Sequence, residues 1–401
     1  MPLLAQCGYG RGDKIEQALR ARSIRGAILS PRDETRDRLE SFCASLRQDW
    51  PNAMILFDPQ FYAAPLPNAR DGHLADYPYY TDNAGLSRNK FRPREIERYV
   101  RGCLEYQVQS LPDLNYLISP SVPFDDFGDS WSQIALNMAE ESVDDCSSRR
   151  DVPPLLVTIA LSQSSLRDPA RMNEFLDTLS ALEVPGFYLL VQRNSTTLQP
   201  AMDAASMSNL LFFVYVLATL NNYEVVMGYS DWMGFLLQAV GASMSASGWH
   251  NSLKQFTLAR FLPQTGGRRP RKRYSSLPLL SSPLIVPELE DVYRANLLPS
   301  VLTGGPLDRL LSAGPARGEG GWTDVNSCLA HWESLSRLYT NIESRRTLRT
   351  RLEACASVIR EAQVIYTQLE ASGVFFEATT GPNHLEPWLE AIAAFRREAS
   401  V

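Results

Sequence analysis

The sequence predicts a (β/α)₈ barrel of the TIM type followed by an α-helical C-terminal region. Short apolar runs alternate along the chain with segments of helical periodicity. The runs lack the inside–outside alternation of a sheet with one solvated face, which is typical of parallel strands covered on both sides. Repeated β–α units imply right-handed crossovers between parallel strands. An open, doubly wound parallel sheet is the alternative fold.

Seven apolar runs are predicted to be strands, and helical patterns lie between them. The runs are 26–30, 53–58, 114–119, 155–161, 186–192, 224–228 and 242–247; the helical patterns are 33–50, a stretch beginning at Pro93, 130–146, 169–182, 204–220 and 232–240. An eighth strand is expected at 277–286, where Pro278 and Pro283 remove backbone N–H donors and make it irregular. Eight such units would close a barrel.

The remaining segments divide the chain into four parts. Residues 1–25 are expected to form a glycine-rich flap and a helix, and residues 26–290 the barrel. Within the barrel, residues 63–92 are too long for a plain connection and are predicted to lie over the mouth. Residues 291–324 contain a glycine-rich stretch that predicts a linker, and 325–401 predict a helical C-terminal domain.

The composition is that of an ordinary globular protein, with 44% hydrophobic residues and a formal net charge of −6. The longest apolar run, 210–220, is about half of what crosses a bilayer. The first residues lack the basic start and apolar stretch of a secretion signal. Six cysteines are scattered without metal-binding spacing, which favours a reducing compartment. The protein is therefore expected to be soluble and cytoplasmic, without a membrane partner.

Two aspartates that follow predicted strands are the leading catalytic candidates. In (β/α)₈ barrels the working side chains lie at the carboxyl ends of the strands. Asp58 ends the second predicted strand and Asp231 follows the sixth. Two carboxylates that face one cavity can divide the roles of nucleophile and general acid or base. The alternative is that Asp58 caps a turn with Pro59 and Asp231 caps the helix that begins at Trp232.

Other side chains near the strand ends are candidates for substrate binding. Amides can hydrogen-bond a base or sugar, indole rings can stack on one, and a glycine next to a lysine can hold a phosphate. The candidates are Gln60, Tyr62, Gln192, Arg193, Trp232, Gly248, Trp249 and Lys254. Packing is the alternative for the aromatic residues, and a structural turn for the glycine.

One short segment, 268–273, concentrates positive charge. It contains Arg268, Arg269, Arg271, Lys272 and Arg273. Such a run is predicted to bind the phosphates of a nucleotide or nucleic acid. The alternatives are a solvated loop and a clamp to an acidic surface of a partner. Because the net charge is negative, any attraction to nucleic acid would depend on this local patch.

The sequence indicates no metal and no cofactor. Cys328 and His331 have the spacing of half a zinc site, but no second pair accompanies them. Ser247, His250 and Asp231 contain the groups of a nucleophilic triad, but their spacing does not select one.

Two functions are compatible with these features. The first is an intracellular enzyme that acts on a phosphate-bearing, glycosidic or nucleotide-like substrate by carboxylate acid–base or nucleophilic chemistry. The second is a non-catalytic barrel in a protein or nucleic-acid assembly, with the C-terminal helices binding a protein partner or a second copy. Convergence of Asp58, Asp231 and Gln60 in one cleft, with a perturbed carboxylate pKa, would favour the enzyme.

Overall fold

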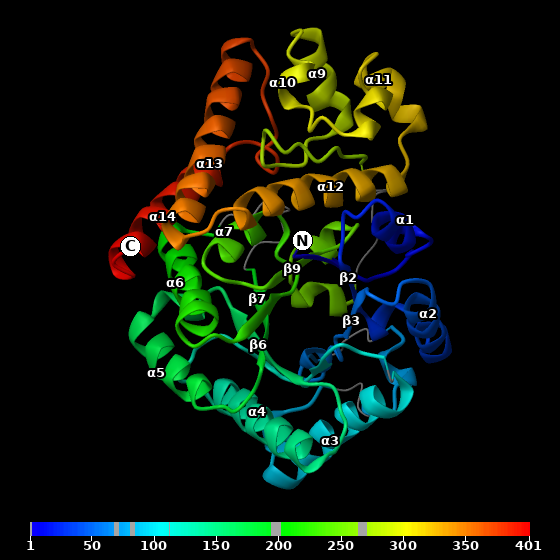
Figure 1. Ribbon diagram of the computed structural model, residues 1–401, viewed down its shortest axis with the longest axis vertical. Coiled ribbons are helices and arrows are strands. Elements are labelled where there is room, and N and C mark those ends of the chain that lie inside the picture. Colours follow the sequence, from blue (N-terminus) through cyan, green and yellow to red (C-terminus); the bar gives the residue numbers. More distant parts are fainter. Residues whose placement is uncertain (1, 68–71, 81–84, 112, 194–201, 264–270) are drawn as a thin grey trace.

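The computed structural model describes residues 2–67, 72–80, 85–111, 113–193, 202–263 and 271–401. At its centre, eight parallel strands curve into a nearly closed barrel (Figure 1). The strands are β1 (Leu3–Gln6), β2 (Gly26–Leu29), β3 (Met54–Phe57), β4 (Leu117–Ile118), β6 (Leu155–Ser162), β7 (Gly186–Gln192), β8 (Glu224–Met227) and β9 (Met244–Ser247). A further short strand, β5 (Pro123–Phe124), pairs with β6.

The strand order confirms the predicted barrel. It runs β3-β2-β1-β9-β8-β7-β6-β4, which follows the chain around a ring. A doubly wound sheet would instead reverse its order at a switch point. The ring is completed between β3 and β4 by Asn115, whose backbone N–H donates to the carbonyl of Ile55 (3.0 Å). The side-chain Oδ1 of the same asparagine accepts from the N–H of Ile55 (2.8 Å).

Helices alternate with the strands and cover the outside of the barrel. They are α1 (Lys14–Arg20), α2 (Arg36–Asp49), α3 (Pro93–Ser110), α4 (Ser130–Ser148), α5 (Pro169–Ser180), α6 (Ala204–Tyr215), α7 (Gly234–Ala239) and α8 (Asn251–Lys254). All eight residues of β6 are buried, as expected for a strand covered on both faces. The first position of β2 requires glycine, because the carbonyl of Met54 on β3 lies where the Cβ atom of any other residue would be.

The first strand of the barrel differs from the prediction. Residues 3–6, expected within a flap, form β1 and pair with β2 on one side and β9 on the other. Pairing on both sides stabilises this strand, although four residues are too few for the sequence to indicate a strand here. The segment 277–286 is not a barrel strand; its neighbourhood forms only isolated antiparallel bridges, Arg273 with Leu284 and Ser276 with Ser281. Its prolines cannot donate to a ladder.

The described part of the 63–92 insertion packs beside the end of β3. Tyr77 and Tyr79 lie with their ring centroids 6.2 Å and 6.3 Å from that of Phe57. The hydroxyl of Tyr79 donates to the carbonyl of Pro59 (3.0 Å). Residues 68–71 and 81–84 of the predicted mouth loop lie outside the described residues.

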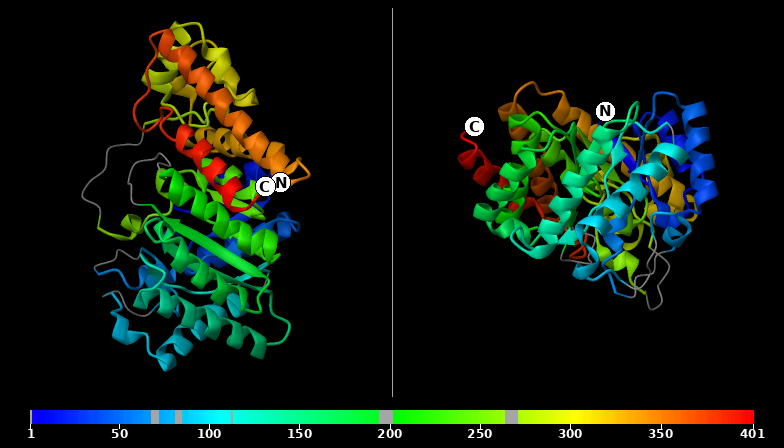
Figure 2. Two further views of the ribbon diagram at one scale, coloured as in Figure 1. Left: turned by 90° about the vertical axis from the view of Figure 1, so that its left-hand side faces the viewer. Right: turned by 90° about the horizontal axis from the view of Figure 1, so that it is seen from below.

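The C-terminal region is docked on the barrel. It comprises α9 (Glu290–Arg294), α10 (Leu298–Val301), α11 (Pro315–Gly318), α12 (Asp324–Glu343), α13 (Leu348–Ala371) and α14 (Leu385–Glu398). Figures 1 and 2 show α9, α10, α11 and most of α13 at one end of the long axis, with α12 next to the barrel and α14 beside α6. Helix α12 packs against α1 and α7, and α14 packs against α6.

The predicted linker 291–324 is a folded part of this region. It contains short helices and the buried side chains of Val301, Leu311 and Trp322. Gly304, Gly305 and Gly314 lie between its short helices, and the other glycines lie within them. Among the described residues, no helix combines the length and apolar character that a membrane span needs.

Candidate functional site

Asp58 lies at the carboxyl end of β3 and is buried among hydrogen-bond donors. Its Oδ1 accepts from the backbone N–H of Gln60 (2.9 Å). Its Oδ2 accepts from the hydroxyls of Tyr62 (2.9 Å) and Tyr188 on β7 (3.1 Å). The structure therefore brings Asp58, Gln60 and Tyr62 together as predicted substrate-site neighbours, and adds Tyr188 from across the barrel.

Burial perturbs the acidity of this carboxyl group. Loss of hydration raises the pKa of Asp58 to about 6, although the donors at Gln60, Tyr62 and Tyr188 and the charge of Arg260 act in the opposite direction. Burial disfavours the charged form of a carboxyl group, while hydrogen bonds to that form favour it. Desolvation is the larger effect here, so Asp58 can exchange a proton near neutral pH.

The side chain of Arg260 contacts one residue that follows β2 and one that follows β8, and its charge acts on Asp58. Its guanidinium donates to the hydroxyl of Tyr229 (3.0 Å) and forms a buried ion pair with Asp33. The side chain of Gln60 reaches the same tyrosine hydroxyl at 3.4 Å and accepts from the backbone N–H of Arg32 at 3.1 Å. The side chains of Gln60, Tyr229 and Arg260 therefore form one hydrogen-bonded network at the carboxyl ends of the strands.

Two buried side chains at this end of the barrel have unused hydrogen-bonding groups. Neither amide atom of Gln6, at the end of β1, has a hydrogen-bond partner among the described residues, although the side chain lies beside Tyr188. The Nη2 of Arg193, after β7, also has none, while Nη1 contacts the sulfur of Met233 (2.9 Å). Buried polar groups without partners are rare, so these groups indicate a place for ligand or ordered water.

Asp231 lies in a second cluster and does not join Asp58. Its Oδ1 is 3.0 Å from Nε2 of His331 on α12 and 3.4 Å from the hydroxyl of Ser247 at the end of β9. Among the described residues, the two aspartates have no hydrogen-bond partner in common. The structure therefore does not join the two carboxylates in one hydrogen-bonded cluster, because Asp231 is bonded to a C-terminal helix.

The backbone is left-handed at three residues that follow strands. The φ angles of Gln60, Tyr229 and Asp231 are 53°, 50° and 43°. Side chains other than glycine seldom adopt this conformation, and such residues concentrate at functional sites. This strain therefore supports both clusters as functional candidates.

His331 is completely buried and holds Asp231 as a carboxylate. Burial and the nearby charge of Lys254 lower the pKa of His331 to about 4, so its imidazole is neutral at pH 7. Burial would raise the pKa of Asp231, but the hydrogen bond from His331 and the charge of Lys254 outweigh it and lower that pKa. A neutral imidazole that donates from Nε2 must accept at Nδ1.

That acceptor begins a chain of hydroxyl groups. Nδ1 of His331 is 2.9 Å from the hydroxyl of Ser275, which is 3.0 Å from that of Ser282. The indole N–H of Trp232 donates to Ser282 (3.3 Å). Each group in this chain therefore donates to the next one: Trp232 to Ser282, Ser282 to Ser275, Ser275 to His331, and His331 to Asp231.

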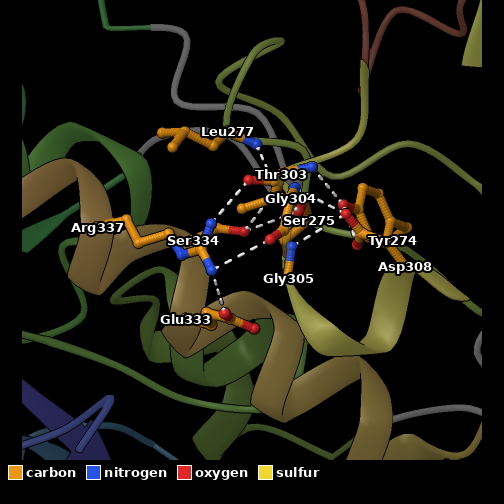
Figure 3. A network of polar contacts seen from close by, with 10 residues as sticks. All are labelled: Tyr274, Ser275, Leu277, Thr303, Gly304, Gly305, Asp308, Glu333, Ser334 and Arg337. Carbon is orange, nitrogen blue, oxygen red and sulfur yellow. Dashed lines mark hydrogen bonds and ion pairs between the residues drawn. The ribbon is translucent and has the colours of Figure 1, made fainter. Parts of the chain in front are cut away.

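The C-terminal region fixes Ser275 through a network around Thr303 (Figure 3). The carbonyl of Ser275 accepts from the hydroxyls of Thr303 (3.1 Å) and of Ser334 on α12 (2.9 Å). The guanidinium of Arg337 donates to the carbonyl of Thr303 (2.9 Å). Ser275 is therefore positioned by two separate segments of the C-terminal region.

A narrow cavity lies at the exposed end of this hydroxyl chain. Its lining includes Asp231, Trp232, Lys254, Arg273 and Ser282. The side chain of Lys254 is only 8% exposed. Its ammonium group makes no hydrogen bond or ion pair with any residue of the described chain. Burial lowers the pKa of Lys254, an effect that Asp231 offsets only in part.

The other predicted binding residues are mainly structural here. Trp249 donates to the carbonyl of Tyr9 (2.8 Å) and packs edge-on against Trp332. Gly248 lies against Leu253 and the carbonyl of Gln6, which leaves no room for an anion at its Cα. Gln192 is half-buried at the end of β7, where its carbonyl accepts from the N–H of Gln163.

The described part of the basic run contacts the C-terminal region. Arg271 forms a bidentate ion pair with Glu377 (2.8 and 2.9 Å), and Lys272 donates to the carbonyl of Glu319 (2.5 Å). Arg273 donates to the carbonyl of Ser282 (2.8 Å). These three side chains therefore bind other parts of the same chain. Arg268 and Arg269 lie outside the described residues.

Fold and site together define a nearly closed (β/α)₈ barrel with two buried polar clusters at the carboxyl ends of its strands. No protein-family model matches the sequence, and neither does any curated protein. Within the described ranges, no three His, Cys, Asp or Glu side chains are arranged to hold a metal ion.

Proposed function

We propose that this protein is an enzyme whose reaction takes place at the carboxyl ends of the barrel strands, with Asp58 as the group that accepts and returns a proton. The observation that carries this proposal is the buried Asp58 carboxyl, with a pKa of about 6. A proton-transfer group works best when its pKa lies near the working pH. Proton transfer also suits Asp58 better than nucleophilic attack, because burial disfavours the ionised form that a nucleophile needs.

The proposed substrate is a small phosphate-bearing, glycosidic or nucleotide-like molecule. The amide of Gln6, which lies beside Tyr188, offers N–H donors and a carbonyl acceptor, which suits a base edge or a sugar hydroxyl. The free guanidinium nitrogen of Arg193 suits an anionic oxygen. Gln60 and Tyr229 supply further polar contacts beside Asp58.

A ligand and turnover screen tests this proposal. The purified protein is mixed with nucleotides, sugar phosphates and glycosides, and products are followed by mass spectrometry. We expect turnover of at least one compound by the wild type and a loss of roughly 100-fold or more in Asp58→Asn. Asp37→Asn makes the same chemical change at an exposed position and should keep full activity. Unchanged turnover in Asp58→Asn would exclude the proposed role.

A non-catalytic role is the second candidate, and one observation favours it. The ring of Tyr62 packs edge-on against Phe256 and Phe261, with centroids 4.9 and 5.7 Å apart. The rings thus hold Tyr62, which donates to Asp58, and Asp58 is only 1% exposed, so a substrate must displace the side chains around it. Absence of both stabilisation and turnover across the screen, with binding only to a macromolecule, would establish this role instead.

A further inference from the structure

We propose that the cavity between the end of β8 and the C-terminal region binds one oxyanion group, a phosphate or a carboxylate, held by Lys254 and Arg273. Asp58 is not part of the lining of this cavity, and the two proposals share only the charge of Arg193, so the oxyanion site does not depend on catalysis at Asp58. It lies where the barrel meets α12, so residues from both parts of the chain build it.

The balance of buried charge is the first argument. Arg193 and Lys254 are 7% and 8% exposed, and Asp231 is the carboxylate that both interact with. His331 is neutral and adds no charge. Buried charges in proteins are normally paired. Two buried cations with one carboxylate leave an excess positive charge, which an anion would neutralise.

Among the causes that shift the pKa of Lys254, Asp231 is the one carboxylate, whereas Glu288 and Glu377 act on Arg273. The segments that follow Arg193 and precede Arg271, residues 194–201 and 264–270, lie outside the described residues and contain no Asp or Glu. These segments therefore cannot supply a second carboxylate to Lys254, and an anion from solution or from a ligand would neutralise its charge.

The lining of the cavity gives the second argument. Lys254 reaches it with a free ammonium group, and Arg273 brings a second cation. Ser282 lies on the same wall, and its hydroxyl is already engaged with Trp232 and Ser275. Charged donors around one point form the usual environment of a bound oxyanion, so Lys254 and Arg273 are the groups that would hold it. Asp231 also lines the cavity, but its Oδ1 is hydrogen-bonded to His331, on the side of α12.

The size of the cavity limits the ligand. Its volume is about 20 Å³. One water molecule needs about 10–15 Å³ on this scale. The cavity therefore has room for about one or two oxygen atoms of an anionic group, and the rest of the ligand would lie outside it. The terminal oxygens of a phosphate or of a carboxylate fit this description.

Anion titration of the full-length protein tests the proposal. Inorganic phosphate and acetate are added at equal ionic strength, with sodium chloride as the reference, and binding is measured by calorimetry and thermal shift. We expect saturable binding of at least one of the two oxyanions, with a rise in Tm that follows its concentration. Phosphate binding alone assigns a phosphoryl group, and acetate binding alone assigns a carboxylate. Equal effects of chloride would overturn the proposal.

Matched variants locate the binding. Lys254→Met should remove it, and Arg273→Met should weaken it at least tenfold. Lys254→Met is expected to fold, because it deletes a buried charge without a hydrogen bond and fills the space with an apolar chain of similar length. Arg271→Met, two residues from Arg273 and outside the cavity lining, should bind as the wild type does, and so should Asp58→Asn. Retained binding in Lys254→Met would overturn the proposal.

Discussion

Nε2 of His331 lies 3.0 Å from Oδ1 of Asp231, so a helix of the C-terminal region completes the polar end of barrel strand β8. The same imidazole contacts Ser247 at the end of β9 and Ser275 beyond it. The C-terminal region is therefore part of one candidate site. Its helix α12 supplies a side chain that the barrel alone lacks.

The first prediction concerns Asp231. Asp231→Asn removes the carboxylate that compensates Lys254 and Arg193, and leaves their charges buried. Breaking a buried charge interaction from one side costs about 3–5 kcal/mol. We expect a decrease of about 3 kcal/mol in the free energy of unfolding, measured with urea. Asp37→Asn, on the surface, should change it by less than about 0.5 kcal/mol. A loss below 1 kcal/mol in Asp231→Asn would show that the buried cations do not depend on this carboxylate.

The second prediction concerns protonation of His331. Its folded pKa of about 4 lies below the ordinary 6.5, so the unfolded chain takes up the proton first as pH falls. The stabilising contribution is present above pH 6.5 and is lost between about 6.5 and 4. The full loss is about 3 kcal/mol. In NMR spectra, the ring signal that His331→Gln removes should not titrate between pH 8 and 5. A midpoint near 6.5 for that signal would contradict the lowered pKa of His331.

Asp58 should show the opposite dependence on pH. Its folded pKa of about 6 lies above the ordinary 3.8, so the folded state holds the proton more tightly. This contribution is complete below about pH 3.8 and is lost as pH rises to about 6, by about 3 kcal/mol. Asp58→Asn lacks the titrating group. We therefore expect its free energy of unfolding, relative to the wild type, to rise between pH 4 and pH 7 in urea titrations. Parallel curves would contradict the raised pKa.

Local patterns predicted the barrel, because parallel strands covered on both faces require uninterrupted apolar runs. Seven of these runs contain strands of the structure, and the helical patterns at 130–146 and 169–182 contain most of α4 and α5. The first strand was missed because four residues, Leu3–Gln6, carry too weak a pattern on their own. Its stability comes from pairing with β2 and β9, which are distant in sequence.

The candidate site was predictable only where its residues follow strands. Asp58, Gln60 and Tyr62 were found in this way, since their position in the sequence fixes their place at the mouth. Tyr188 lies within the apolar run of β7, and nothing in its surroundings distinguishes it from a packing residue. His331 was paired with Cys328 by spacing alone.

Contacts between the barrel and the C-terminal region depend on docking, which no local pattern encodes. The triad of Ser247, His250 and Asp231 illustrates this point. The serine and the aspartate do meet, but the histidine that joins them is His331. His250 was the candidate because it is close to Ser247 in the sequence. In the folded structure the distant His331 contacts both the serine and the aspartate.

The last prediction tests the corrected first strand. Leu4 is fully buried in β1, which lies between β2 and β9 in the barrel. Leu4→Ala would remove a large apolar side chain from a site that cannot collapse, because strands flank it on both sides. Such substitutions cost about 2–5 kcal/mol. Leu220→Ala makes the same change where the side chain is 59% exposed, and should cost less than about 0.5 kcal/mol. Urea unfolding of the two variants distinguishes a barrel strand from a detachable flap, since equal and small losses would place residues 3–6 outside the core.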